Sequence, residues 1–212
     1  MPRVAPFESH HQRYEAWFDE HEAAYISELL ALRPFVPWEG RGLKIGVGSG
    51  RFAGPLGVQV GVDPSPAMLV HAAARGIEVV EGTAENLPFE AGTFDHALVV
   101  TTICFVDSAE RMAAEARRVL KPGGRLVIGF IDRESALGRH YLAHQFESVF
   151  YREATFFSSG EVERLLDGAG FSVESWAQTL ARPLPQTLSI EPLRWGRGDC
   201  AFVVVTATAP RR

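Results

Sequence analysis

Apolar residues recur with two different spacings along the chain. Between Ser9 and Leu32, aromatic and aliphatic residues fall at helical intervals with acidic residues among them, which predicts one amphipathic helix or two short ones. Pro34 and Pro37 mark the end of this segment, because proline clashes with the preceding turn and offers no N–H donor. Short apolar or β-branched runs follow, and they predict strands buried on both faces at residues 43–47, 58–62, 77–80, 94–100 and 126–131.

Segments of helical character separate these runs. Residues 65–75 begin with a serine cap and an early proline, and residues 108–120 begin with a serine and stop at the Lys-Pro-Gly-Gly segment 121–124. We interpret this segment as a helix stop and a tight turn that directs the fifth strand. The alternation of strand and helix predicts right-handed crossovers and a mainly parallel α/β sheet with helices on both faces.

The pattern loosens beyond Asp132. Helices are expected over residues 134–149 and 159–168, and strands over 171–180 and 200–206. The last two strands are expected to form an antiparallel hairpin at one edge of the sheet. The proline-rich connector between them is long for a compact domain, so we expect it to be either mobile or part of a site.

A glycine-rich loop, GVGSG, begins at Gly46, where the first predicted strand ends. Glycines at alternate positions let the backbone turn sharply and let a ligand approach without Cβ collisions, although a plain strand-to-helix turn would need them too. Arg51 stands where the dinucleotide fingerprint GxGxxG requires glycine, which disfavours a nucleotide-dependent oxidoreductase. The second strand ends at Asp63, whose carboxylate could accept hydrogen bonds from ribose hydroxyls or serve as an ordinary turn residue before Pro64.

Five ordered segments together resemble a known family: LKIGVGSGRF, GVDPSPAML, EGTAENLPF, FDHALVVTT and RVLKPGGRLVIGF. They are similar to the class I S-adenosylmethionine-dependent methyltransferases, and in particular to the small type that resembles the ubiquinone and menaquinone biosynthesis methyltransferases. The likeness covers residues 42–130 and becomes looser towards the C-terminus. It implies a Rossmann-like, mainly parallel seven-stranded sheet, S-adenosylmethionine as cofactor with S-adenosylhomocysteine as product, and methyl transfer to a small-molecule acceptor.

The resemblance also implies which residues hold the cofactor. The glycine loop would pass around its methionine moiety, Asp63 would hold the ribose hydroxyls, and Met68 would pack on the adenine. Thr101 would face the sulfonium region. The complete set of expected cofactor-binding residues is Gly46, Gly48, Gly50, Asp63, Pro64, Met68, Thr83, Ala84, Glu85 and Thr101.

The chain departs from the family pattern in three places. Lys44 stands where members usually carry an acidic residue, and Thr83 stands where many carry aspartate. The short stretch between Gly50 and Asp63 leaves room for a first helix of only a turn or two. These departures motivate an alternative reading, a non-catalytic S-adenosylmethionine- or S-adenosylhomocysteine-binding module of the same fold.

The acceptor side of the site is less defined. A general base is needed only if the nucleophile is protonated at the working pH. The candidates are His140, Tyr141 and Tyr14, with His10 and His11 added if the N-terminal helix caps the site; each has an ordinary surface or core role as its alternative. A set of aromatic residues could line an apolar acceptor pocket or simply form the core: Tyr14, Trp17, Phe18, Phe105, Phe130, Phe150 and Tyr151.

Length, charge and cysteine content limit the remaining possibilities. A chain of 212 residues predicts one domain: an N-terminal helical cap (1–40), a cofactor-binding core (41–131) and a C-terminal half with a substrate-side insert (132–212). The formal charge of −5 argues against nucleic acid as a partner. No segment resembles a signal peptide or a membrane span, so we expect a cytoplasmic monomer or homodimer without membrane contact. Cys104 and Cys200 are too few for a metal framework; we expect no metal and no disulfide, and expect Cys104 to be a packing residue.

Overall fold

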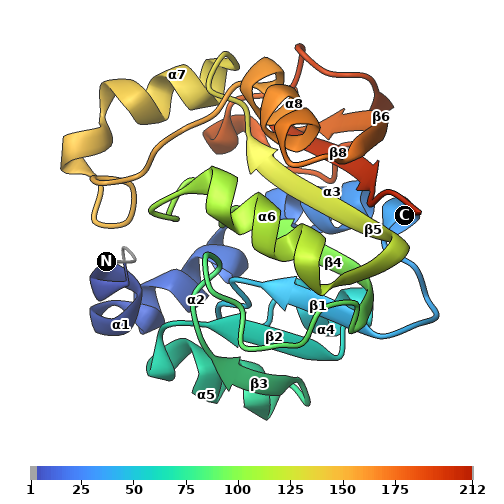
Figure 1. Ribbon diagram of the computed structural model, residues 1–212. Helices are drawn as coiled ribbons and strands as arrows, with labels where there is room; N and C mark the ends of the chain where they lie inside the picture. The colour runs from blue at the N-terminus through green and yellow to red at the C-terminus, as the bar shows by residue number, and fades with distance from the viewer. Residues whose placement is uncertain (1–3, 212) are drawn as a thin grey trace.

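The computed structural model describes residues 4–211. They form one eight-stranded sheet of order β3-β2-β1-β4-β5-β8-β6-β7, with helices packed around it (Figure 1). Strands β3, β2, β1, β4 and β5 are parallel, and β8 pairs antiparallel with β5 on one side and β6 on the other. The predicted mainly parallel α/β fold with an antiparallel C-terminal edge is therefore confirmed. The strands are β1 Gly42–Ile45, β2 Val60–Asp63, β3 Glu78–Glu81, β4 Phe94–Val100, β5 Leu120–Ile131, β6 Ser172–Thr179, β7 Arg194–Trp195 and β8 Phe202–Thr208.

The sheet has one strand more than expected. Strand β7, Arg194–Trp195, lies in the proline-rich connector and pairs antiparallel with β6. The same connector is anchored by Glu191, which is buried although it belongs to a loop. Its carboxylate accepts hydrogen bonds from the Ala181 amide (2.7 Å) and the Arg182 guanidinium (2.9 Å). The hydrogen bonds of the buried Glu191 carboxylate thus hold the connector against the domain.

Apart from α1, which precedes the predicted N-terminal segment, the helices occur where they are expected, with breaks that the hydrophobic spacing does not show. The N-terminal amphipathic segment is divided at His21, whose backbone leaves the helical region (φ −121°, ψ 40°). The first crossover helix, α4, has only four residues, as its short sequence requires. The helices are α1 Ala5–Ser9, α2 His11–Glu20, α3 Glu22–Leu32, α4 Ala53–Leu56, α5 Pro66–Ala74, α6 Ala109–Val119, α7 Ala136–Ala143 and α8 Ser159–Gly168; short 3₁₀ turns η1 Arg33–Phe35, η2 Gln145–Glu147 and η3 Leu184–Gln186 join them.

The Lys-Pro-Gly-Gly segment 121–124 ends helix α6 as expected, but it belongs to β5 instead of preceding it. Strand β5 pairs with β4 at Leu120, loses register, and pairs again from Arg125. The intervening residues bulge outwards, and Gly123 adopts a left-handed φ of 77° that favours glycine.

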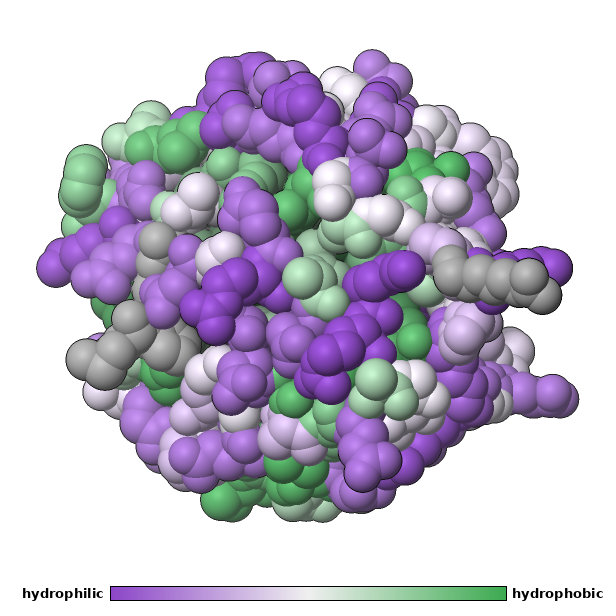
Figure 2. Space-filling view, viewed as in Figure 1, coloured by the Kyte–Doolittle hydropathy of each residue, from purple (hydrophilic) through white to green (hydrophobic). Residues whose placement is uncertain are grey.

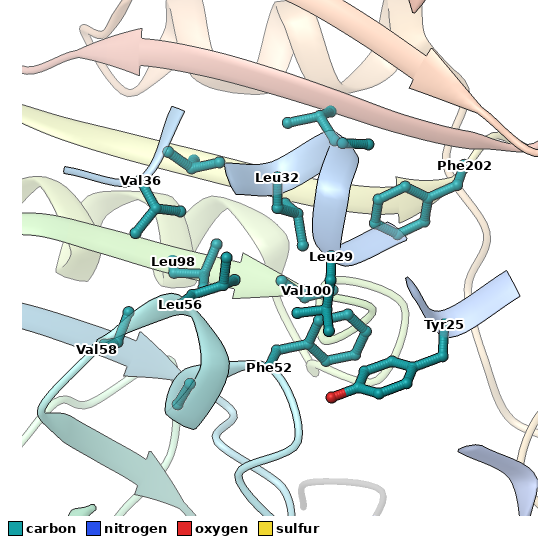
Figure 3. Close-up of a cluster of buried hydrophobic side chains, with 14 of the residues drawn as sticks. Tyr25, Leu29, Leu32, Val36, Phe52, Leu56, Val58, Leu98, Val100 and Phe202 are labelled. Carbon is teal, nitrogen blue, oxygen red and sulfur yellow. The ribbon is translucent and has the colours of Figure 1, made fainter. Parts of the chain in front are cut away.

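Alternate residues of the central strands enter two different hydrophobic cores. Leu98 of β4 packs with helices α3, α4 and α5, together with the side chains drawn in Figure 3. Its neighbours Ala97 and Val99 point to the opposite face and pack with α6 and α8. Burial on both faces explains why these strands have continuous apolar sequences.

The parallel strands end on one side of the molecule. In Figure 1, β1 and β5 point towards the side where α1, α2 and α7 lie. The carboxyl ends of parallel strands are where ligands bind in open α/β sheets, so any site is expected there. The face in Figure 2 is polar over most of its area, with apolar residues scattered across it. Within residues 4–211, no helix is both long enough and apolar enough to cross a membrane.

Candidate functional site

The glycine loop after β1 turns through backbone conformations that side chains rarely adopt. Gly46 and Gly48 have φ values of 62° and 54°. A Cβ added at Gly46 would lie 2.3 Å from the Thr102 methyl carbon, and one added at Gly48 would lie 3.2 Å from the Tyr14 hydroxyl. The loop therefore brings bare backbone to the end of the sheet, where a ligand can approach it closely.

Asp63 closes the next strand and faces the same cavity. One of its carboxylate oxygens accepts a hydrogen bond from the Gly48 amide (2.8 Å), and the other accepts from the Ser65 amide (3.0 Å). Burial raises the pKa of Asp63, while these two amides and nearby Lys44 oppose that shift. Each oxygen keeps a second lone pair that can accept from a ligand hydroxyl.

The first cavity collects the ends of four strands. It is lined by the glycine loop, by Asp63, and by the segments that follow β3 and β4. Every residue predicted to bind the cofactor lines this cavity except Gly50: Gly46, Gly48, Asp63, Pro64, Met68, Thr83, Ala84, Glu85 and Thr101. A Cβ at Gly50 would instead meet Ile77 and Ala72, so this glycine permits packing behind the loop. The individual cofactor contacts remain predictions.

Glu85 also has a local structural partner. Its carboxylate accepts hydrogen bonds from the amides of Asp107 (2.6 Å) and Ser108 (3.3 Å), just before helix α6. This ties the loop after β3 to the loop after β4, and both loops line the first cavity.

Lys44 is turned away from the cavity. Its side chain is 1% exposed, and its Nζ donates to the carbonyls of Gly46 (2.7 Å) and Ile45 (3.0 Å), with the Thr102 hydroxyl at 3.4 Å. Burial lowers its pKa to about 7, against the opposing effect of Asp63. The lysine therefore supports the glycine loop from below, a role that the sequence does not reveal.

Helices α1 and α2 cover the carboxyl end of the sheet. Glu15 of α2 bridges Arg51 (3.1 Å) and Arg75 (2.6 Å), which flank the glycine loop. Glu8 of α1 accepts from Ser65, the residue that caps helix α5. These contacts place Phe7 and Tyr14 over the first cavity.

A second and larger cavity, of about 470 Å³, lies beside the first. Phe7, Tyr14, Thr101 and Phe105 line both cavities. The predicted aromatic set lines the second cavity with the single exception of Phe130, which is buried in the core between the sheet and helices α6 and α8. Leu184 of the connector also lines it, so the connector is part of the candidate site.

The candidate general bases fall into two groups. Tyr14, Tyr141 and His140 line the second cavity. Burial raises the pKa of Tyr141 to about 12 and shifts that of Tyr14 further upward, so both phenols stay protonated at neutral pH and can donate hydrogen bonds. His140 is exposed at the cavity wall. His10 and His11 line neither cavity; His11 lies 3.2 Å from His71 instead.

Sequence reasoning missed Glu28. It lies in helix α3, is only 4% exposed, and lines the second cavity. Burial raises its pKa to about 8. A signal did exist, because Glu28 interrupts the run of apolar residues along α3, but a lone acidic residue in a helix is ordinarily exposed.

Backbone strain also gathers at the second cavity. Among the described residues, Thr101 (φ 50°) and Leu180 (φ 64°) are the non-glycine residues with left-handed backbones, and both line this cavity. Such conformations persist where the surrounding structure enforces them, and they cluster at functional sites.

Residues 4–211 contain no grouping of three or more histidine, cysteine or acidic side chains that could hold a metal ion. Cys104 is buried and donates to the Thr101 carbonyl at 3.3 Å.

Comparisons with known proteins agree with this architecture. Residues 43–128 match the family described as methyltransferase domain. The crystal structure of an S-adenosylmethionine-dependent methyltransferase from Thermotoga maritima, named as a possible histamine N-methyltransferase, is similar with a TM-score of 0.94 and 48% identity. That similarity covers 98% of this chain and 99% of the other.

Two further relatives carry no assigned activity. An uncharacterized protein of Methanocaldococcus jannaschii is 41% identical over 201 residues, which are 95% of this chain and 97% of that protein. An uncharacterized protein of Mycobacterium tuberculosis is 38% identical over 174 residues; the match covers 80% of this chain and 61% of the longer mycobacterial protein. From the identity and coverage shared with the Thermotoga maritima enzyme, together with the domain match, the chain belongs to the class I S-adenosylmethionine-dependent methyltransferases.

Proposed function

We propose that this protein binds S-adenosylmethionine in the first cavity and transfers its methyl group to a small molecule held in the second. The observation that carries the proposal is the shared wall of Phe7, Tyr14, Thr101 and Phe105, which joins a cavity lined by bare glycine backbone and a carboxylate to a larger aromatic one. A donor and an acceptor could meet at that wall.

The residues of the first cavity fit the cofactor that the family uses. Asp63 has free lone pairs for ribose hydroxyls, Gly46 and Gly48 present bare backbone at the cavity wall, and Met68 offers an apolar surface for the adenine. Lys44, the departure from the family pattern, points its nitrogen at backbone carbonyls and does not line the cavity.

S-Adenosylmethionine supplies a methyl group that its sulfonium already activates, so the protein has mainly to align the reactants and exclude water. Helices α1 and α2 cover the site for this purpose, held by Glu15 and Glu8. Tyr14 and Tyr141 remain protonated and orient an acceptor by donating hydrogen bonds.

Binding and turnover of the cofactor test the proposal. We would titrate S-adenosylmethionine and S-adenosylhomocysteine into the purified protein by calorimetry, with NADH as a control ligand. We expect Asp63→Ala to weaken binding at least tenfold, about 1.4 kcal/mol, because the ribose loses its acceptor. An unfolding midpoint for each variant separates this loss from collapse of the loop that Asp63 also supports.

The outcomes distinguish this function from its alternatives. Release of S-adenosylhomocysteine with any acceptor dismisses the non-catalytic module, whereas tight binding without turnover over a broad acceptor panel favours it. Absence of binding by the wild-type protein would overturn the proposal, and binding of NADH would revive an oxidoreductase. The panel includes histamine because of the name given to the Thermotoga maritima relative, and quinone precursors because the motifs resemble those of quinone-biosynthesis methyltransferases.

A further inference from the structure

We propose that Glu28 holds a positively charged group of the methyl acceptor, so that the acceptor is an organic cation, such as an amine, with an aromatic or aliphatic body. The proposal rests on the proposed function, because it identifies what occupies the second cavity. It depends on the burial of Glu28, on its lack of partners, and on where it lies in the cavity.

No partner within residues 4–211 explains the burial of Glu28. Among residues 4–211, no hydrogen-bond donor and no cation contacts its carboxyl group, and desolvation alone accounts for its raised pKa. Buried acids in folded proteins are normally paired, because an unpaired one costs free energy. A carboxyl group held in a cavity at that cost is a candidate for receiving a ligand.

Glu191 shows what a structural buried acid looks like in the same part of the molecule. It is 5% exposed, close to the value for Glu28, but its carboxylate accepts from the Ala181 amide and the Arg182 guanidinium. Its own amide donates to Ser27, the neighbour of Glu28 (2.8 Å). Burial acts to raise the pKa of Glu191, but the Ala181 amide and the Arg182 guanidinium outweigh it and lower that pKa, the opposite of what happens at Glu28.

The surroundings of Glu28 favour a cation with an apolar body. Tyr14, Tyr25, Tyr141 and Tyr151 are close enough for its charge to raise their pKa values. Aromatic faces attract cations, and a bound ammonium would supply the charge that the pocket lacks. The other charged residues of the cavity, Arg13, Glu20 and Glu147, are exposed.

The position of Glu28 sets the orientation of the acceptor. Glu28 lines the second cavity but not the first, whereas Thr101 and Tyr14 line both. The cationic group would therefore lie in the second cavity, and the atom that receives the methyl group would lie nearer the first. Glu28 is thus assigned to recognition of the acceptor, and not to removal of a proton at the reacting atom.

Binding of such a cation must release a proton. With a pKa of about 8, the free Glu28 carboxyl is mostly protonated at pH 7. When an ammonium group binds, the ionised carboxylate is favoured, so the carboxyl proton passes to the solvent while the ammonium keeps its own. Released protons can be counted by calorimetry in buffers of different ionisation enthalpy.

The experiment uses three probes of similar shape: phenethylamine (cationic), 2-phenylethanol (neutral) and 3-phenylpropionate (anionic). Each is titrated at pH 7 into the protein with and without saturating S-adenosylhomocysteine. We expect phenethylamine to bind at least tenfold more tightly than 2-phenylethanol, with release of close to one proton, and 3-phenylpropionate to bind most weakly. In Glu28→Gln we expect the preference to vanish and proton release to cease, while the affinity for S-adenosylhomocysteine stays unchanged.

Two further variants keep the result interpretable. Glu28→Met, which replaces the acid with an apolar side chain of similar length, should also lose the preference if Glu28→Gln folds poorly. Glu22→Gln, an exposed substitution on the same helix, should retain the preference for the cation. Equal binding of the charged and neutral probes, no binding of any probe to a protein that binds S-adenosylhomocysteine, or a preference that persists in both Glu28 variants would overturn the proposal. A cation preference in a protein that does not bind S-adenosylhomocysteine would support recognition of a cation by Glu28 but reject the proposed function.

Discussion

The two cavities of this protein are formed by different parts of the chain. The first is formed where strands end, mainly by backbone turns, and its residues come from short consecutive segments of the chain. The second is formed by side chains from α2, α3, α7 and the loops around β6, which lie far apart in sequence. The cavity proposed for the cofactor therefore has a local sequence signature, whereas the cavity proposed for the acceptor depends on how distant elements pack.

Lys44 near the first cavity and Glu28 at the second are both buried and ionisable, but they differ in their hydrogen-bond partners. Lys44 satisfies its nitrogen with carbonyls of the adjacent glycine loop, so it belongs to the local structure. Glu28 faces the second cavity without a partner among the described residues. The first residue supports a preformed loop, and the second is available to a ligand.

The largest expected effect is on the pH dependence of stability. Burial raises the pKa of Glu28 from its usual 4.5 to about 8, so between these values the unfolded state loses a proton that the folded state keeps. The contribution of Glu28 to the free energy of unfolding therefore falls by roughly 3 kcal/mol as pH rises from 5 to 8. The groups facing Glu28 are Tyr14, Tyr25, Tyr141 and Tyr151, whose raised pKa values keep them neutral in this range.

Urea midpoints at pH 5, 7 and 8 measure this contribution. Glu28→Gln should lose the decline, whereas Glu22→Gln, an exposed substitution on the same helix, should keep it. The lowered pKa of Lys44 has the opposite sign, because its cost is full below pH 7 and disappears as pH rises towards 10.5. Equal slopes for the wild type and Glu28→Gln would mean that Glu28 is not held in its neutral form.

The next effect concerns the backbone character of the first cavity. Gly46→Ala would place a Cβ 2.3 Å from the Thr102 methyl group at a φ of 62°, so we expect the affinity for S-adenosylhomocysteine to fall about 100-fold, or about 2.7 kcal/mol. Gly54→Ala is the matched control, because no atom lies within 4 Å of an added Cβ in helix α4. A Gly46→Ala protein with wild-type affinity would show that the loop does not hold the cofactor through its backbone.

The smallest expected effect is on the methylation rate, and it tests the wall that the two cavities share. Tyr14→Phe removes a hydroxyl from a residue that lines both cavities. We expect a roughly tenfold lower methylation rate, from the loss of one hydrogen bond to the acceptor, with cofactor affinity changed less than threefold. His140→Ala, at an exposed position of the cavity wall, should change the rate less than threefold. If His140→Ala has the larger effect, a base on α7 would be assigned to the reaction.

Features that depend on neighbouring residues are predicted from the sequence, whereas features that depend on contacts between distant residues are not. Strand and helix positions in the first half were predicted because each depends on spacing, caps and prolines within a few residues. The extra strand β7 is missed because a run of two residues is too short to show a strand pattern in the sequence. Gly50 fits the spacing of the motif but does not line the first cavity, and a Cβ there would meet Ala72 and Ile77, so its contact with the cofactor stays a prediction.

The sequence by itself determined the family, the α/β architecture and the first cavity, because those features depend on short segments whose residues act on their own backbone. Packing between distant elements places Lys44 beneath the glycine loop and encloses the second cavity with aromatic residues of α2 and α7. The same packing leaves Glu28 facing that cavity without a partner among residues 4–211. The burial of a side chain and its hydrogen-bond or ion-pair partners depend on the residues that pack around it, which lie far away in the sequence. An isolated glutamate in a helical segment looks the same in sequence whether it meets water, an arginine or an open cavity.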